Sequence, residues 1–317
     1  MAEAPKPIRF NASWSTQFRF TQAIGRGLSE LMPVTATVLV GRRGDEGLAE
    51  GEVDIVYTKS VNNEHQFNGR GFFSNGPARP WLRTIAWLPQ EDRLLFAVAP
   101  ELNISTFEEL AERKSALKMV AQTGSTEPFL KAYGFSYDDI RSWGGSIGSM
   151  EHTARDAKER RDRGELDAFF GDGSAYDFSA WTWVAQHGYR FLDLREDVMA
   201  KLESELGLRR ITTPVGFLPG ITTNLISPDD SHIVVSCHER LDDELAYNLA
   251  KGIDLNKRDI ELSSIQMDYG VRGVLPIIEP TYWTSLTGQI DRQWDEKITG
   301  APLHDGARQY YKEIGVL

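Results

Sequence analysis

The chain has 317 residues and a formal net charge of −11 at neutral pH, with 41% hydrophobic and 26% charged residues. This length is too great for one ordinary small domain, and the composition is typical of a folded globular chain. The acidic balance disfavours binding to nucleic acid or to anionic lipid, and no apolar run approaches the roughly 18 residues of a membrane span.

The single cysteine, Cys237, excludes an intrachain disulfide and a cysteine-based metal cluster. No other group of residues suggests a metal ligand set, and we expect neither a metal nor a cofactor. Residues 1–7 lack the apolar stretch of a signal peptide. We therefore expect a periplasmic location if a signal peptide has been removed, and a cytoplasmic one otherwise.

The first elements alternate between strand and helix. Residues 8–12 form a short apolar run, and residues 13–16 form a polar turn with helix-capping chemistry. Apolar residues then recur at helical spacing over 18–31, and residues 35–40 read as the next strand. The middle of the chain repeats this order, with a strand at 117–121, a Gly-Ser-Thr turn at 124–126 and a helix at 127–133 ended by Gly134.

A second internal similarity joins residues 51–57 (GEVDIVY) to residues 164–170 (GELDAFF). In both segments a helix is expected to end at the glycine, and an apolar strand follows an acidic turn. Two similarities in the same order predict two α/β lobes with one plan, each containing a parallel sheet. We expect lobe one to comprise residues 1–98 and 214–317, and lobe two residues 99–213.

In open α/β sheets, ligands bind beyond the carboxyl ends of the strands. This rule selects loops rich in hydroxyl groups and aromatic rings, which suit a carboxylate or phosphate beside apolar walls. The candidate ligand-binding residues are Ser13, Trp14, Thr16, Tyr57, Ser125, Thr126, Trp143, Ser146 and Asp172. Helix capping, core packing and solvated turns remain alternative roles for each of them.

Residues 62–70 read as a polar loop that contains His65 and Arg70. Arg70 could hold a carboxylate with two hydrogen bonds, and His65 could serve as a proton donor. Exposed loop residues are the alternative for both. They would be the catalytic pair only if the protein is an enzyme.

Two further segments match the sequence motifs of enzyme active sites. Residues 144–148 (GGSIG) match the nucleophile elbow of serine hydrolases, but the preceding residues 138–143 make a poor buried strand. His238-Glu239 begins like a zinc-protease motif, yet Asp242 stands where the second histidine is required. A zinc protease is therefore strongly disfavoured, whereas a serine hydrolase stays a minor alternative.

Several segments over nearly the whole chain resemble the solute-binding proteins of TRAP transporters of the TAXI type. The most specific is the ending Pro302-Leu303-His304-Asp305-Gly306-Ala307, followed by Tyr310-Tyr311. The other segments are residues 48–54, 81–86, 104–110, 124–127 and 164–170. The resemblance implies an α/β, two-lobed fold of the type-II periplasmic-binding-protein kind, with an acidic small molecule in the cleft between the lobes.

We therefore expect a solute-binding component of a TRAP-type uptake system, with a small organic acid as ligand and membrane transporter subunits as possible partners. The alternative is a cytoplasmic enzyme on the same fold, similar to decarboxylases of aromatic carboxylic acids, with His65 and Arg70 as its catalytic pair. A ligand-responsive sensor is a third hypothesis. We expect neither nucleic-acid binding nor membrane insertion.

Overall fold

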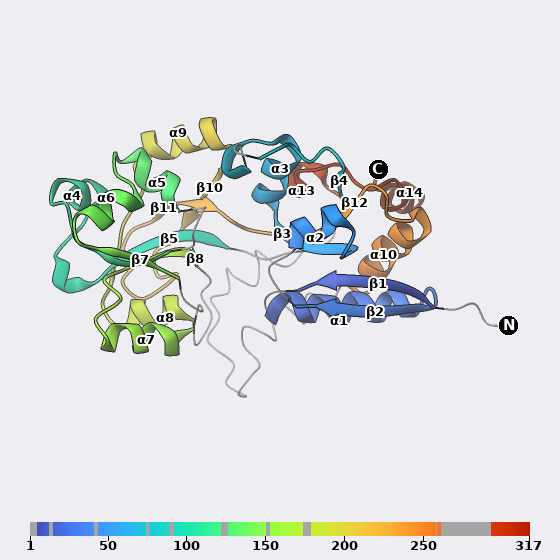
Figure 1. Cartoon of the computed structure of the whole chain (residues 1–317), viewed down its shortest axis with the longest axis horizontal. Helices are drawn as coiled ribbons and strands as arrows, with labels where there is room; N and C mark the ends of the chain where they lie inside the picture. The colour runs from blue at the N-terminus through green and yellow to red at the C-terminus, as the bar shows by residue number, and fades with distance from the viewer. Residues whose placement is uncertain are drawn as a thin grey trace. The chain divides into compact units, whose positions relative to one another are not determined.

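The computed structural model describes residues 5–12, 15–40, 44–73, 76–88, 92–121, 126–149, 153–173, 179–257, 259–260 and 293–317. These residues form two compact units, one of residues 1–91 with 231–317 and the other of residues 92–230 (Figure 1). Each unit contains one mixed sheet with helices packed on it. The predicted α/β class is confirmed.

Unit 1 is built on a five-stranded sheet with the order β2-β1-β3-β12-β4. Its strands are β1 (Lys6–Asn11), β2 (Val34–Leu39), β3 (Ile55–Lys59), β4 (Leu82–Leu88) and β12 (Ile233–His238). Its helices are α1 (Ser15–Ser29), α2 (Gly44–Glu50), α3 (Ser60–Asn68), α10 (Asp243–Leu255), α13 (Glu296–Thr299) and α14 (Asp305–Glu313), with a short 3-10 turn at Gly71–Phe73.

Side chains point alternately to the two faces of the sheet along the strands of unit 1, so a core forms on each face. Ile55 and Tyr57 of β3 pack in the core beneath α1, α10 and α14, whereas Val56 packs against Leu48 of α2. Gly27 lets α1 approach α10 closely, because a Cβ there would lie 2.8 Å from the Gly252 carbonyl oxygen. Gly27 therefore serves helix packing.

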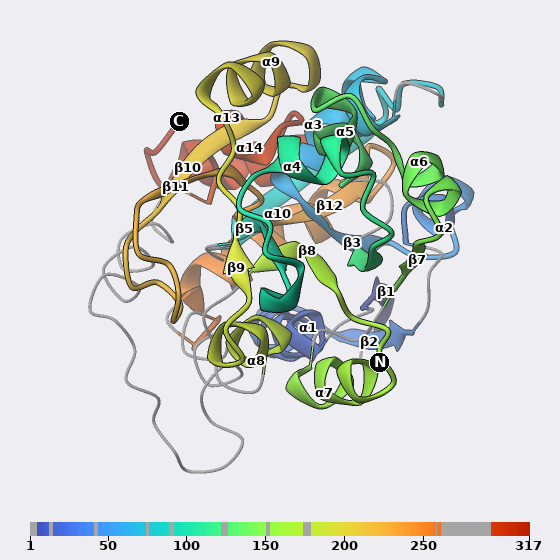
Figure 2. The same ribbon diagram turned by 90° about the vertical axis from the view of Figure 1, so that its left-hand side faces the viewer.

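Unit 2 has the strand order β10-β11-β5-β8-β6-β7, with β9 pairing β5. Its strands are β5 (Arg93–Val98), β6 (Lys118–Ala121), β7 (Ser146–Gly148), β8 (Ala168–Gly173), β9 (Arg190–Phe191), β10 (Arg209–Thr213) and β11 (Leu225–Asp229). Its helices are α4 (Phe107–Glu112), α5 (Glu127–Ala132), α6 (Tyr137–Ser142), α7 (Ala154–Asp162), α8 (Ala180–Gln186) and α9 (Glu196–Leu206), with a 3-10 turn at Pro100–Leu102. Within this unit, α7 and α8 cover one face of the sheet, and α5 and α9 cover the other (Figures 1 and 2).

The two sheets repeat one plan. In each, the first strand lies between the second and the third, and an antiparallel strand adds beside the third. That added strand is the first one after the chain enters the unit, β5 in unit 2 and β12 after the return to unit 1. This is the strand order of the type-II periplasmic-binding-protein kind, and the predicted fold is confirmed.

The repeated Gly-Glu-apolar-Asp segments have the same structural role in both units. The Asp54 carboxylate accepts a hydrogen bond from the Arg9 backbone N–H at 2.8 Å, and Asp167 accepts one from Lys118 N–H at 3.0 Å. In return, the backbone N–H of each aspartate donates to the carbonyl of the same partner. The motif thus ties the start of the third strand to the first strand, and the glycine before it ends the helix with a positive φ.

The unit boundaries differ from those we expected. Unit 2 begins at Asp92 rather than at residue 99, and it ends at Asp230 rather than at residue 213. The strand that we assigned to lobe one, β5, pairs with β8 and β11 of the second sheet. An apolar strand carries no sequence mark of the sheet to which it adds, so the boundary was placed after it instead of before it.

Candidate ligand site

In unit 1, polar residues end β1 and β3. Asn11 ends β1 and is 7% exposed, and Lys59 ends β3 and directly precedes α3. The backbone of Lys59 is extended, and its side chain makes no helix-capping hydrogen bond. Lys59 therefore places a cation directly before the start of α3.

The first turns of α1 and α3 carry no acidic residue. In contrast, α4, α6, α7, α9 and α10 each carry Asp or Glu in the first turn, whereas α8 of unit 2 also carries none. A helix N-terminus bears about half a positive charge, which those carboxylates offset. At α1 and α3 no first-turn carboxylate offsets it, so this edge of unit 1 is suited to an anion.

In unit 2, the corresponding edge contains Thr126 and Arg93. Thr126 is fully buried, and its hydroxyl forms a hydrogen bond with that of Tyr137. Burial raises the pKa of the Tyr137 phenol, so this pair remains neutral at ordinary pH. The Thr126 side chain therefore holds α5 against α6.

Arg93 was not singled out by the sequence analysis. It begins β5 opposite Gly173, at the carboxyl end of β8, and it is 1% exposed. Its Nη1 donates to the Thr212 carbonyl at 3.4 Å, and its Cζ lies 4.1 Å from the centre of the Phe217 ring. The Arg93 guanidinium is therefore buried against Thr212 and Phe217, and its only sequence signal is a charge at the start of an apolar strand.

Several predicted residues lie outside what the structure describes. These are Ser13, Trp14 and Ser125, together with the side chains of Thr16 and Asp172. The backbone of Thr16 is in the first turn of α1. Asp172 belongs to β8 and pairs with Leu94, so residues 171–173 continue a strand instead of forming the turn that we expected.

Tyr57 lies in the core of unit 1 and is 8% exposed. Its hydroxyl forms a 2.8 Å hydrogen bond with the Thr21 hydroxyl. Burial raises the pKa of the phenol, which is the expected effect of an apolar environment. Its placement is that of a core residue that joins β3 to α1.

Trp143 and Ser146 are at the opposite edge of their sheet from Thr126. Ser146 begins β7 and pairs with Lys118, the first residue of β6, whereas Thr126 follows the end of β6. The expected convergence of these residues at one edge is therefore wrong. Residues 137–142 form helix α6, so the loop precedes a strand rather than following one, and the nucleophile-elbow geometry is not met.

The segment that we expected to be a polar loop around His65 forms helix α3. The His65 ring is fully buried and packs against Gly71, and Arg70 pairs with Glu64. A general acid must reach its substrate. This placement gives the His65–Arg70 catalytic hypothesis no support, and the helix was missed because its polar residues, Asn62 and Asn63, imitate a loop.

Within the described part of the chain, no group of His, Cys, Asp or Glu side chains could hold a metal ion. None of the helices described there has the length and apolar character that crossing a membrane requires. Burial strongly raises the pKa of the Cys237 thiol, so it has little thiolate character.

No family model and no curated protein sequence matches the chain. Among solved structures, it is similar to XAC2383 from Xanthomonas citri bound to ATP, at 10% identity and a TM-score of 0.49, over 98% of this chain and 99% of that one. It is also similar to a substrate-binding protein of an ABC uptake transporter from Streptococcus pneumoniae with bound histidine. The identity is 10% and the TM-score 0.43, over 83% of this chain and 92% of that one. A third similar structure is iron-bound HitA from Pseudomonas aeruginosa, at 13% identity and a TM-score of 0.43, over 98% of this chain and 100% of that one. At these values no ligand transfers to this chain.

Proposed function

We propose that the chain is a solute-binding protein that holds a small organic anion, most simply a carboxylate, at the carboxyl edge of the sheet of unit 1. The observation that carries this proposal is the charge distribution at the helix N-termini. The protein has 46 acidic residues, yet none occurs in the first turn of α1 or α3, and Lys59 stands between β3 and α3.

The energetics of such a site favour an anion. Backbone N–H groups at a helix start and a lysine ammonium form charge-assisted hydrogen bonds, which are worth about 1.5–3 kcal/mol each. A bound carboxylate would supply the negative charge that α4, α6, α7, α9 and α10 obtain from their own Asp and Glu residues.

A role as the receptor of a TRAP-type uptake system, in an exported location, belongs to the same proposal. Its support is the resemblance of the ending around His304 to that family and the type-II strand order. The decarboxylase hypothesis needs an accessible acid, which fully buried His65 does not offer.

The test is a calorimetric titration of the full chain with a panel of C2–C8 mono- and dicarboxylates, with product formation followed by NMR. We expect saturable binding of at least one acid without turnover, and at least tenfold weaker binding in Lys59→Gln. Lys131→Gln is the matched control, because Lys131 is an exposed lysine of unit 2 paired with Glu127. Turnover of an acid, or equal affinity in Lys59→Gln and the unsubstituted protein, would contradict the proposal.

A further inference from the structure

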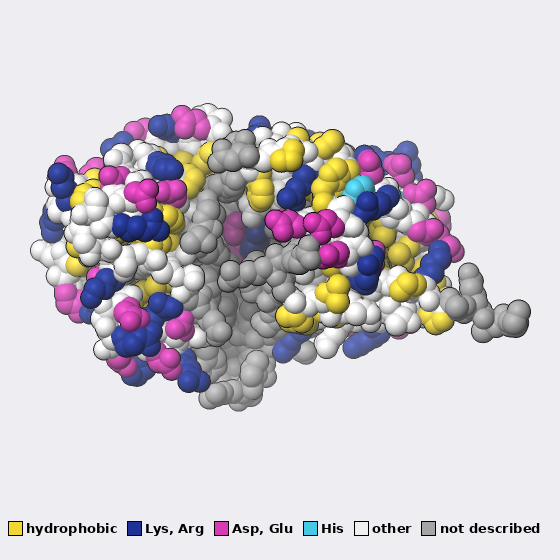
Figure 3. Space-filling model, viewed as in Figure 1, with side chains coloured by type: hydrophobic (Ala, Val, Ile, Leu, Met, Phe, Trp, Pro, Cys, Tyr) yellow, Lys and Arg dark blue, Asp and Glu magenta, His cyan; other side chains and the backbone are white. Residues whose placement is uncertain are grey.

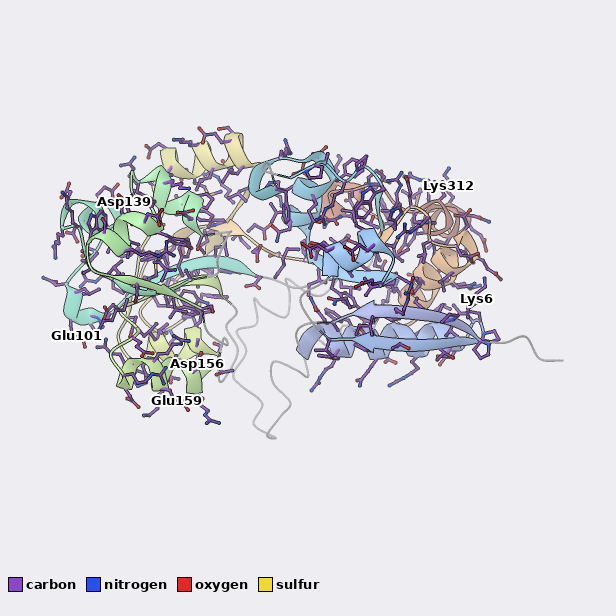
Figure 4. All side chains as sticks on the ribbon, viewed as in Figure 1. Lys6, Glu101, Asp139, Asp156, Glu159 and Lys312 are labelled. Carbon is purple, nitrogen blue, oxygen red and sulfur yellow. The ribbon has the colours of Figure 1, made fainter. Side chains whose placement is uncertain are left out.

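A groove of about 480 Å³ opens on unit 1 at the edge where β1 and β3 begin, opposite to the edge described above. Its lining includes the apolar side chains Pro7, Leu48, Val53, Leu241 and Leu245. The volume lies in the range of small-molecule sites. Lys6, which Figure 4 labels at the start of β1 near α10, also lines it.

Two of the three cations of the groove already have carboxylate partners. Lys6 Nζ lies 3.2 Å from Asp242 Oδ1 and 3.1 Å from Glu244 Oε2. The Arg9 guanidinium donates two hydrogen bonds to Asp54, at 2.8 and 3.0 Å. Basic and acidic side chains are interspersed on the visible surface of both units (Figure 3). These side chains have little left to offer a ligand.

Arg240 differs, because its guanidinium has no carboxylate partner among the described residues. Its Nη2 donates to the Leu48 carbonyl at 3.3 Å and to the Ala49 carbonyl at 3.1 Å, at the C-terminus of α2. Gly51 makes room for this arrangement, since a Cβ there would lie 2.8 Å from Arg240 Nη2. The guanidinium is thus fixed through one nitrogen, while Nε and Nη1 keep their N–H groups for another acceptor.

His238 adds a neutral donor to the same groove. Its ring stacks on Trp81 at 4.6 Å between centres, and its Nδ1 accepts a hydrogen bond from the Arg240 backbone N–H at 3.2 Å. Burial and the neighbouring Arg240 lower the pKa of the imidazole, so the ring is neutral at pH 7 and its proton is on Nε2. The groove therefore holds a fixed guanidinium and an imidazole N–H beside an apolar floor.

We infer that this groove is a second binding site, for a small monocarboxylic acid whose carboxylate binds Arg240 and whose hydrocarbon part lies on the apolar floor. The three carboxylates that line the groove, those of Glu50, Asp54 and Asp242, disfavour a dianion. The site is independent of the proposed function, since it is at the other edge of the sheet.

The experiment uses the full chain, isotope-labelled, titrated with hexanoate and with hexanamide as the uncharged analogue. We expect hexanoate to shift backbone amide resonances of residues 48–54 and 238–242, and hexanamide to shift them about tenfold less readily. Arg240→Gln should weaken hexanoate binding about tenfold or more. Leu241→Trp should also weaken it, because the larger side chain fills the groove without altering Arg240.

Arg113→Gln is the matched control. Arg113 is likewise an exposed arginine that donates to two backbone carbonyls, those of Leu102 and Asn103. It differs in that its Nη2 also lies 3.7 Å from Glu109 Oε1 and in that it lines no described pocket. Its replacement should leave hexanoate binding unchanged. Equal binding of hexanoate and hexanamide, or undiminished binding in a folded Arg240→Gln variant, would overturn the inference. Neither result depends on the outcome of the Lys59 titrations.

Discussion

Replacement of Asn62 by aspartate separates the stability of α3 from its proposed role in anion binding. Asn62 is in the first turn of α3, and the substitution adds one negative charge with almost no change in shape. A carboxylate at this position offsets the helix dipole and should stabilise the protein by about 0.3–1 kcal/mol. The same carboxylate should repel an anion bound at the helix start.

The size of the repulsion follows from Coulomb's law. Two unit charges about 7 Å apart interact by roughly 0.6 kcal/mol at a dielectric constant of 80 and by roughly 2.4 kcal/mol at 20. Asn62→Asp should therefore weaken anion binding by about three- to fifty-fold while it raises the midpoint of thermal unfolding. Calorimetric titration with the tightest acid of the panel, together with thermal unfolding, measures both effects.

Asn68→Asp is the control at the other end of the same helix. Asn68 is six residues further along, about 9 Å in helix rise, and it is exposed. The substitution removes the hydrogen bonds that Asn68 Nδ2 donates to the Glu64 carbonyl at 3.0 Å and to the Glu64 carboxylate at 2.9 Å. Its new charge repels Glu64, adds unfavourably to the C-terminal end of the dipole and is screened from the ligand by salt. It should lower stability and leave affinity within a factor of two. The reasoning is refuted if Asn62→Asp stabilises the protein without weakening binding, or if both variants weaken binding equally.

Three further predictions concern stability. Asp54→Ala and Asp167→Ala should each destabilise their own unit by about 1.5–3 kcal/mol, because each carboxylate accepts a hydrogen bond from a backbone N–H of the first strand. Urea unfolding monitored by hydrogen exchange measures the two units separately. An effect on the other unit alone would contradict this prediction. His304→Ala should cost about 1–2 kcal/mol, since the imidazole caps α14 through Gly306 N–H, and His304→Asn should restore most of it. Burial raises the pKa of Tyr189 to about 12, so the unfolded chain loses the phenol proton at a lower pH than the folded protein does. The free energy of unfolding should therefore fall as pH rises from about 10 towards 12. In alkaline denaturation, Tyr189→Phe should make that fall shallower.

The elements were largely predictable from the sequence because their signals are local. Helical spacing of apolar residues gave α1, and the Ser-Thr turn before Glu127 gave α5 to within a residue or two. The repeated Gly-Glu-apolar-Asp segments predicted two units with one plan, and the hydrogen bonds of Asp54 and Asp167 show the physical basis of that repeat. Helix α3 was missed because asparagine favours loops and caps, and tertiary packing overrode that preference.

The candidate site was less predictable, because strand direction and pairing decide which loops share an edge. The sequence places Ser146 after a Gly-Gly turn, but only its pairing with Lys118 shows that it begins β7. Arg93 looks like the ordinary end of a turn until β5 adds antiparallel beside β8 and brings it to the carboxyl end of that strand.

The sequence by itself determined the α/β class, the strand and helix segments and the internal repeat, since these follow from apolar spacing and turn residues within about ten positions. The tertiary structure alone decided which charges remain available to a ligand. Arg9, Arg70 and Arg240 are equivalent in the sequence, yet the first two have acidic partners and the third binds carbonyl oxygens beside Gly51. The binding capacity of a charge depends on neighbours that are distant in the chain, as Arg240 and Leu48 are, and these meet only in the folded protein.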